Sequence, residues 1–344
     1  MAKTLATRMA FGQEIIEIAK TNENFVVCKA DTKTCGLEKF GKYFPEREFS
    51  FGIAEQNLVA ASAGMAACGN KVFLATFAVF ASMRACEQVR TFVCYPNLNV
   101  TVIGTHAGLQ VGGDGATHAA IEDVSIMRSF PNMTVVQPAD AVAARALAHA
   151  AVDFTGPLYV RLHRNPVADL YDPATYKFEW GKANTVVDNG SDMTMIVSGI
   201  LLKKALDAAA ILKEQGIGVR VLDMATIKPL DKEAVLKALG TGFSRGIANH
   251  DVEVRRNAKG RPFVVLHGRA KEVADERGVR ELPLSLSYTH TDAVACALAI
   301  TEESVRAQEE RVNPMEELAK QFKEARSLLD EMDAPKKASE DPAN

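Results

Sequence analysis

The feature that most constrains the fold is a regular alternation of helix-patterned segments with short β-rich runs, which continues to about residue 163. Because parallel strands need long crossover connections, usually helices, this alternation predicts an α/β domain with a mainly parallel sheet over residues 1–165. The expected strands span residues 24–30, 71–76, 100–104, 134–137 and 158–162, and the expected helices span residues 8–20, 55–68, 80–95, 121–130 and 138–152.

A second α/β unit is expected after a change of pattern. Residues 166–190 are rich in turn-forming Pro, Gly and Asn and lose the earlier periodicity, which indicates an interdomain linker. A strand–helix–strand pattern then opens a second domain, assigned to residues 191–300, whose pattern weakens beyond about residue 240. Residues 301–344 are expected to form a charged helix and a disordered tail.

Composition narrows the function classes. The chain is 47% hydrophobic and 24% charged, which is ordinary for a globular enzyme. Its net charge of −3 and its lack of a basic block indicate no nucleic acid or membrane surface as a partner. No long apolar run suggests a signal peptide or a membrane span, so a cytoplasmic location is expected. The six cysteines include no Cys-x-x-Cys pair that would indicate zinc or a redox dithiol.

Three short motifs stand at the ends of successive expected βα units. They are Phe-Gly-Ile-Ala-Glu-Gln-Asn at 51–57, Ala-Thr-Phe-Ala-Val-Phe at 75–80, and a glycine-rich stretch at 104–118 that contains two histidines. An open α/β sheet binds its ligands at the carboxyl ends of its strands. The motifs therefore predict one site that contains an acid, an aromatic pair and two histidines.

Each candidate residue also has a structural interpretation. Glu55 is either a partly desolvated acid or a first-turn glutamate that complements the helix dipole. Phe77 and Phe80 are either a flat wall for a heteroaromatic ring or core residues. His106 and His118 can bind sugar hydroxyls or carry protons near neutral pH, or they are structural histidines bonded to the backbone.

Asp114 lies between Gly113 and Gly115, and a Gly-Asp-Gly segment can present an aspartate to Mg²⁺. No matching asparagine pattern follows some thirty residues later. We therefore expect no metal site in this chain.

Together the motifs resemble the C-terminal half of transketolase over residues 1 to about 240. This half comprises the domain that binds the pyrimidine of thiamine diphosphate and the start of the transketolase C-terminal domain. The resemblance implies transfer of a two-carbon ketol unit from a ketose phosphate to an aldose phosphate, as in the pentose phosphate pathway. The matching segments, in the family's order, are Gly-Ile-Ala-Glu-Gln-Asn (52–57), Thr-Phe-x-x-Phe (76–80), Thr-His-Ala-Gly (105–108), Gly-Asp-Gly-x-Thr-His (113–118) and Thr-Ile-Lys-Pro-Leu-Asp (226–231).

The resemblance implies a role for each matching residue. Glu55 corresponds to the catalytic glutamate that bonds a ring nitrogen of the aminopyrimidine, and Phe77 and Phe80 to the aromatic residues packed against that ring. Met83 stands where the family has a further aromatic residue. The residues that correspond to those around the sugar hydroxyls and the reacting carbon are His106, Asp114 and His118.

The resemblance also implies a site for the sugar phosphate. Arg8 and Arg164 correspond to arginines that clamp the phosphate, a task suited to the bidentate guanidinium group. Asp31 corresponds to a neighbouring aspartate, and Cys35 stands where the family has a serine. Without the resemblance, Arg8 would be interpreted as a surface cation on an amphipathic helix and Arg164 as a linker residue.

Full-length transketolase has an N-terminal domain that holds the cofactor's diphosphate and its Mg²⁺, and this chain has no counterpart of it. The resemblance therefore implies a separate N-terminal-type partner subunit, most simply in an α2β2 assembly with homodimer contacts, and an inactive isolated chain. Beyond about residue 240 the sequence departs abruptly from the family.

Three alternatives stay open on the sequence. The chain could be a deoxyxylulose-phosphate synthase-like subunit or a 2-oxoacid dehydrogenase β-like subunit, each of which uses the same glutamate but accepts an α-keto acid. It could also be a non-catalytic structural or regulatory partner subunit.

Overall fold

The computed structural model describes residues 4–32, 35–190, 192–232, 234, 252–256, 262–276, 279–281, 284–289, 292–297 and 300–301. The charged helix and tail expected at 301–344 lie outside this described part, apart from residue 301. Residues 235–251 of the expected second domain also lie outside it.

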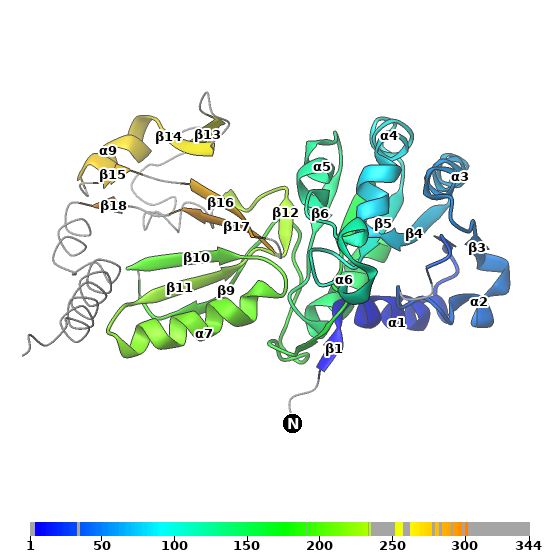
Figure 1. Ribbon diagram of the computed structural model, residues 1–344, viewed down its shortest axis with the longest axis horizontal. Helices are drawn as coiled ribbons and strands as arrows, with labels where there is room; N and C mark the ends of the chain where they lie inside the picture. Colours follow the sequence, from blue (N-terminus) through cyan, green and yellow to red (C-terminus); the bar gives the residue numbers. More distant parts are fainter. Residues whose placement is uncertain are drawn as a thin grey trace, which may run out of the picture.

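A seven-stranded sheet forms the centre of the first unit (Figure 1), and its strand order is β12-β6-β7-β5-β4-β2-β3. All neighbouring strands are parallel except β12, which runs antiparallel to β6. The prediction of an α/β fold with a mainly parallel sheet is therefore confirmed. The strands are β2 (Phe25–Lys29), β3 (Glu48–Ser50), β4 (Lys71–Phe77), β5 (Val100–Thr105), β6 (Thr134–Val136), β7 (Leu158–Arg161) and β12 (Thr226–Lys228).

Helices cover both faces of this sheet (Figure 1). Successive side chains of a strand point to opposite faces, so in β4 Phe73 enters the core under α1 and α6, whereas Val72 and Leu74 enter the core on the other face. This double burial explains why the strands are nearly continuous hydrophobic runs. One face carries α1 (Thr7–Ala19) and α6 (Ala141–Asp153), and the other carries α3 (Glu55–Ala67), α4 (Cys86–Gln88) and α5 (Asp123–Ser129).

The helix expected over residues 80–95 is not a continuous α-helix. It consists of a π-helical segment η2 (Phe80–Arg84), the short α4, and a second π-helical segment η3 (Val89–Cys94). The Ser82 hydroxyl donates a hydrogen bond to the Ala78 carbonyl oxygen at 2.8 Å, a type of bond that competes with helix geometry. Short π-helical segments often occur at functional sites.

Residues 166–190, which we expected to form a linker, contain two short strands. β8 (Pro166–Ala168) pairs antiparallel with β1 (Thr4–Ala6), and β9 (Asn184–Asp188) pairs antiparallel with β11 (Val219–Asp223). Their partners lie far away in the sequence, so periodicity within the segment could not reveal them. The second sheet thus includes residues before position 191.

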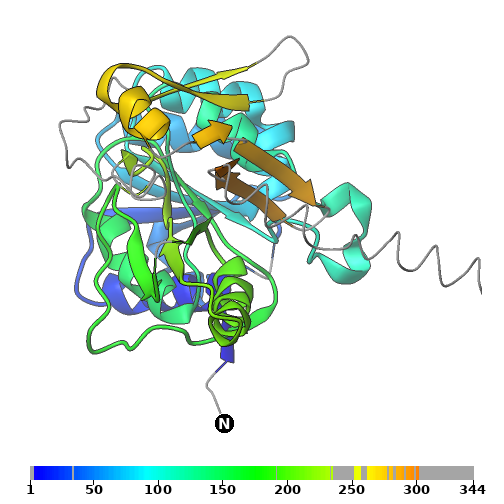
Figure 2. The same cartoon turned by 90° about the vertical axis from the view of Figure 1, so that its left-hand side faces the viewer.

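The second unit lies beside the first (Figure 1). Its three-stranded sheet has the order β10-β11-β9, and α7 (Leu201–Glu214) packs its buried residues against this sheet. Figure 2 views the molecule from the side of this unit, with α7 seen nearly end-on. β12 leaves this unit and joins the first sheet. The remaining elements are β10 (Met193–Val197), α2 (Phe40–Tyr43), β13 (Val252–Arg256), β14 (Pro262–Leu266), α9 (Gly268–Glu276), β15 (Val279–Glu281), β16 (Leu284–Thr289), β17 (Asp292–Ala297), β18 (Ile300–Thr301), and the short 3-10 turns η1 (Pro45–Arg47), η4 (Gly112–Asp114) and η5 (Ala116–His118).

None of the helices within the described ranges combines the length and the hydrophobicity that crossing a membrane requires.

Candidate functional site

The three motifs meet at the carboxyl edge of the central sheet. Phe77 ends β4, His106 follows β5, and both strands are parallel neighbours. The rings of Phe77 and His106 lie 4.1 Å apart between centroids. The ring of His118 meets Phe77 at 5.8 Å and Phe80 at 5.2 Å, both edge to face. Residues from two motifs, up to 41 positions apart, therefore share one cluster of rings.

Phe77 and Phe80 form a flat wall. Their rings are nearly parallel, with an interplanar angle of 21° and centroids 5.9 Å apart. Both side chains are only partly buried and pack against the core cluster from its margin. They are thus not enclosed core residues.

Glu55 is a buried carboxylate at the start of α3. The residue is 1% exposed, whereas a glutamate that only complements the helix dipole is normally solvated. Its Oε2 accepts a hydrogen bond from Arg84 Nη1 at 2.7 Å. The Arg84 guanidinium also lies over the Phe80 ring, 4.1 Å from its centroid. Arg84 therefore connects the acid to the aromatic wall.

Arg84 was not identified from the sequence. The signal that could have found it is an arginine four residues after Phe80, on the same predicted helix. Its contact with Glu55, however, joins residues 29 positions apart, which the pattern within one helix cannot reveal.

His106 is held in a strained and desolvated position. Its φ of 58° lies in the left-handed region, and its ring Nδ1 lies 3.1 Å from the Thr105 hydroxyl oxygen. Burial lowers the pKa of His106 to about 4, and the nearby charges of Arg8 and Arg164 act in the same direction. His106 is therefore a neutral imidazole at physiological pH, able to exchange hydrogen bonds with uncharged hydroxyl groups.

Asp114 and His118 occupy two consecutive 3-10 turns, η4 and η5. Gly115 separates the turns with a φ of 75°, which favours glycine. Asp114 is exposed, and His118 is half-buried with its Nδ1 2.9 Å from the Thr117 hydroxyl oxygen. Both residues thus lie on the open side of the site.

Arg8 and Arg164 lie together beside His106. Arg8 Nε donates to the Arg164 carbonyl oxygen at 3.2 Å, and Arg164 Nη1 donates to the Val111 carbonyl oxygen. Burial lowers the pKa of Arg8, Glu38 opposes this shift, and Arg164 adds to it. Two half-buried guanidinium groups at one point create a local excess of positive charge, which suits an anion.

Cys35 is packed behind this pair of arginines. Its Sγ lies 3.7 Å from the Thr32 carbonyl oxygen, and burial raises the pKa of its thiol. The loop approaches α1 so closely that a Cβ added to Gly12 would lie 2.4 Å from the Gly36 carbonyl carbon. Asp31 is exposed just after β2. Cys35 thus supplies a buried, protonated thiol close to the arginines, whereas Asp31 faces solvent.

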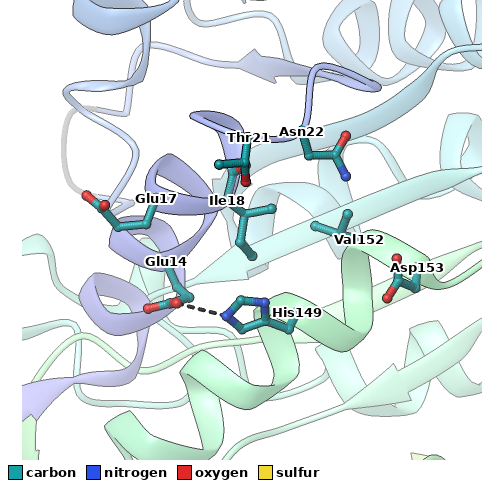
Figure 3. A pocket seen from close by; sticks show the side chains of 8 residues that line it. All are labelled: Glu14, Glu17, Ile18, Thr21, Asn22, His149, Val152 and Asp153. Atoms are coloured by element: carbon teal, nitrogen blue, oxygen red, sulfur yellow. Dashed lines mark hydrogen bonds and ion pairs between the residues drawn. The ribbon is translucent and has the colours of Figure 1, made fainter.

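A polar pocket, drawn in Figure 3, shares no lining residue with this cluster. It lies between the C-terminal halves of α1 and α6 and has a volume of about 350 Å³. These helix ends lead to the amino ends of the strands, so the pocket is at the opposite edge of the sheet. Its lining residues are Glu14, Glu17, Ile18, Thr21, Asn22, His149, Val152 and Asp153.

Within the described residues, no group of three or more His, Cys, Asp or Glu side chains has the arrangement of a metal site.

Comparisons with known proteins identify the family. The family model "Transketolase, pyrimidine binding domain" matches residues 3–168, and "Transketolase, C-terminal domain" matches residues 181–242. A putative transketolase C-terminal section of Methanocaldococcus jannaschii is 43% identical over 233 residues, which cover 67% of this chain and 73% of that protein. One of the subunits of an apulose-4-phosphate transketolase from Phocaeicola vulgatus is 40% identical over 235 residues, which cover 68% of this chain and 75% of that protein.

A solved structure gives the same answer. A split-gene transketolase, described as an inactive beta4 tetramer, matches with a TM-score of 0.63 and 43% identity over 69% of this chain and 76% of that chain. The comparisons do not favour the synthase-like, dehydrogenase-like or non-catalytic alternatives, and they confirm the resemblance found in the motifs. The chain therefore belongs to the transketolase family, in which it corresponds to the C-terminal section of the split-gene members.

Proposed function

We propose that this chain binds the aminopyrimidine of thiamine diphosphate and the sugar phosphate in a two-subunit transketolase. The observation that carries the proposal is the buried carboxylate of Glu55 beside the parallel rings of Phe77 and Phe80. In this proposal a separate N-terminal-type subunit holds the diphosphate and Mg²⁺, and two copies of each subunit form an α2β2 assembly.

The residues fit the pyrimidine half of the cofactor. A flat heteroaromatic ring gains from offset packing on a phenylalanine face, and Phe77 and Phe80 present such faces. A buried carboxylate needs a hydrogen-bond partner, and a ring nitrogen can provide it to Glu55. When bound, thiamine diphosphate supplies the carbon nucleophile and electron sink that break a carbon–carbon bond of the ketose.

The chain's own residues then handle protons and orient the sugar. Glu55 holds a proton between its carboxylate and the ring nitrogen. His106 has Nδ1 directed to Thr105, which leaves Nε2 to bond a sugar hydroxyl. His118 and Asp114, on the open side, are placed for further hydroxyl groups.

Arg8 and Arg164 bind the phosphate of the sugar in this proposal. Their charges already act on His106, so the anion end of the substrate lies close to that histidine. Cys35 lies near Arg8, and its thiol offers a weaker hydrogen bond than a serine hydroxyl. In this proposal Asp31, exposed just after β2, contacts the same end of the sugar. Related subunits act with different sugars, as the names apulose-4-phosphate transketolase and 6-deoxy-6-sulfo-D-fructose transketolase say of two of them.

The test is to purify this chain with a candidate diphosphate-binding subunit and to assay ketol transfer from xylulose 5-phosphate to an aldose phosphate. We expect turnover only when both subunits, thiamine diphosphate and Mg²⁺ are present. Decarboxylation of pyruvate without ketol transfer would instead favour the synthase-like or dehydrogenase-like function. A stable complex that binds thiamine diphosphate but turns over neither substrate would favour a non-catalytic subunit.

A further inference from the structure

The guanidinium group of Arg84 occupies the position at which the cofactor's pyrimidine is expected. It donates to Glu55 Oε2 at 2.7 Å and covers the Phe80 ring at 4.1 Å. These are the two contacts, one to the acid and one to an aromatic face, that the proposed function assigns to the pyrimidine. A flat cation and a flat ring cannot occupy the same face of Phe80 at once.

The two partners of this ion pair differ in their freedom to move. The Glu55 side chain is 2% exposed and fixed at the start of α3, whereas the Arg84 side chain is 44% exposed. Arg84 also ends the π-helical segment η2, so its side chain leaves from a stretch without regular α-helical packing. If the pair opens, Arg84 is the partner that can move into solvent.

We propose that Arg84 is a displaceable occupant of the cofactor site, which neutralises Glu55 in the cofactor-free chain and must move away before the pyrimidine binds. This inference rests on the proposed function, because it needs the pyrimidine to bind at Glu55. Breaking the ion pair between Arg84 and Glu55 adds a free-energy cost to cofactor binding. It also explains how a carboxylate this buried is tolerated before the cofactor arrives, since an unpaired buried charge is strongly unfavourable.

The size of the effect follows from the fraction of molecules in which the pair is open. The apparent Kd equals the intrinsic Kd divided by that fraction. A partly exposed ion pair is worth on the order of 1 kcal/mol, so removing it should tighten cofactor binding roughly three- to tenfold.

The experiment measures the Kd of thiamine diphosphate by titration calorimetry on the two-subunit complex at saturating Mg²⁺. Arg84→Met keeps much of the side chain's length but loses the charge and the fork, and we expect a Kd roughly three- to tenfold lower than that of the wild type. Arg84→Gln provides a second neutral variant with the same expectation. Arg90→Met is the matched control, because it removes the same charge from an exposed position on η3, and its Kd should be unchanged.

Each outcome decides the inference. An unchanged Kd in both Arg84 variants would show that Arg84 does not compete with the cofactor. A higher Kd would show that Arg84 helps to hold the cofactor. Arg84 could do so by staying bonded to Glu55 Oε2 while the pyrimidine bonds to Oε1 of the same carboxylate. An equal decrease of the Kd in Arg90→Met would show that the effect arises from the loss of any positive charge and not from competition between Arg84 and the cofactor. If the wild-type complex binds no thiamine diphosphate, the proposed function fails as well, whereas normal wild-type binding with unaffected variants overturns only the role of Arg84.

Discussion

Two groups of polar side chains beside β5 and β7 differ in what completes them. In the first group, Asp123 accepts hydrogen bonds from the Tyr159 hydroxyl at 2.7 Å and from Arg161 Nε at 2.8 Å. Arg161 also reaches Gln137, whose Nε2 lies 2.9 Å from His163 Nε2. All five residues are buried and come from this chain. We call them the internal network.

The second group is the candidate site, and it is open. Glu55 is buried, but its partner Arg84 is half-exposed, and Asp114 faces solvent. The internal network is largely closed by its own chain and is therefore expected to contribute to stability. The candidate site combines these exposed groups with partly buried rings at its margin, as is expected of a site that another molecule completes. The following predictions test this division, beginning with the largest expected effect.

Replacing Glu55 should affect turnover and leave folding almost unchanged. Glu55→Gln keeps the shape of the side chain but cannot hold the proton at the pyrimidine, so we expect kcat of the two-subunit complex to fall about 10²–10⁴-fold. Assembly, followed by size-exclusion chromatography, should stay intact. Glu17→Gln, at an exposed position on α1, is the control and should behave as the wild type. Full activity of Glu55→Gln would disprove the catalytic assignment.

Breaking the internal network should lower stability and leave cofactor binding unchanged. Asp123→Ala removes the carboxylate that is ion-paired with buried Arg161, and breaking a buried pair in this way typically costs about 3–5 kcal/mol of unfolding free energy. Chemical denaturation of the isolated chain measures this loss. At a temperature where the variant is folded, the Kd of the complex for thiamine diphosphate should match the wild type. A specific loss of cofactor affinity without loss of stability would contradict the division between the two groups.

A buried acid in the second unit should make stability fall as the pH rises. Burial raises the pKa of Asp223 to about 7, and the Tyr171 hydroxyl donates to its Oδ2 at 2.7 Å. Between about pH 4 and pH 7 the native chain therefore holds a proton that the unfolded chain has released. The contribution of Asp223 to stability is thus complete below about pH 4 and is lost as the pH rises through 7, by roughly 4 kcal/mol.

Asp223→Asn cannot titrate and tests this slope. Its unfolding free energy, measured by denaturant titration at several pH values, should decline less than that of the wild type between pH 5 and pH 8. Parallel curves for the two proteins would show that Asp223 does not hold the proton.

His163 of the internal network should make stability fall as the pH decreases, which is opposite to the effect of Asp223. Burial lowers its pKa to about 3, with a further contribution from the charge of Arg161. Below about pH 6.5 this histidine takes up a proton in the unfolded chain but stays neutral in the native chain. Stability therefore falls with decreasing pH, by about 2 kcal/mol at pH 5. His163→Gln should flatten this acid limb in denaturant titrations, whatever its stability at pH 8. An unchanged slope would mean that His163 is protonated in the native state.

The two groups also differ in how well the sequence predicts them. Phe77, His106 and Glu55 stand at strand ends and a helix start, which are local features, and parallel strands bring such ends to one edge of the sheet. The mainly parallel sheet follows in the same way from the alternation of local patterns.

Contacts between distant positions escaped prediction. Asp123 and Arg161 are 38 positions apart, and β1 pairs with β8 across more than 150 residues. Arg84 contacts Glu55 from the end of η2, and the π-helical form of η2 is a deviation that the periodicity of a helix does not encode. In each case the three-dimensional arrangement of the elements, rather than residue type, decides which residues come into contact.

The polar pocket between α1 and α6 should show the smallest effect (Figure 3). His149 Nε2 lies 2.9 Å from Glu14 Oε1, but the His149 side chain is 63% exposed. An exposed pair of this kind contributes little, so His149→Gln should change the unfolding free energy by less than about 0.5 kcal/mol and leave the Kd for thiamine diphosphate unchanged. Denaturation of the chain and calorimetry of the complex measure both. A clear change in cofactor affinity would show that the amino edge of the sheet is coupled to the site at the carboxyl edge, and that polar groups at a surface pocket can matter there as much as open groups at strand ends.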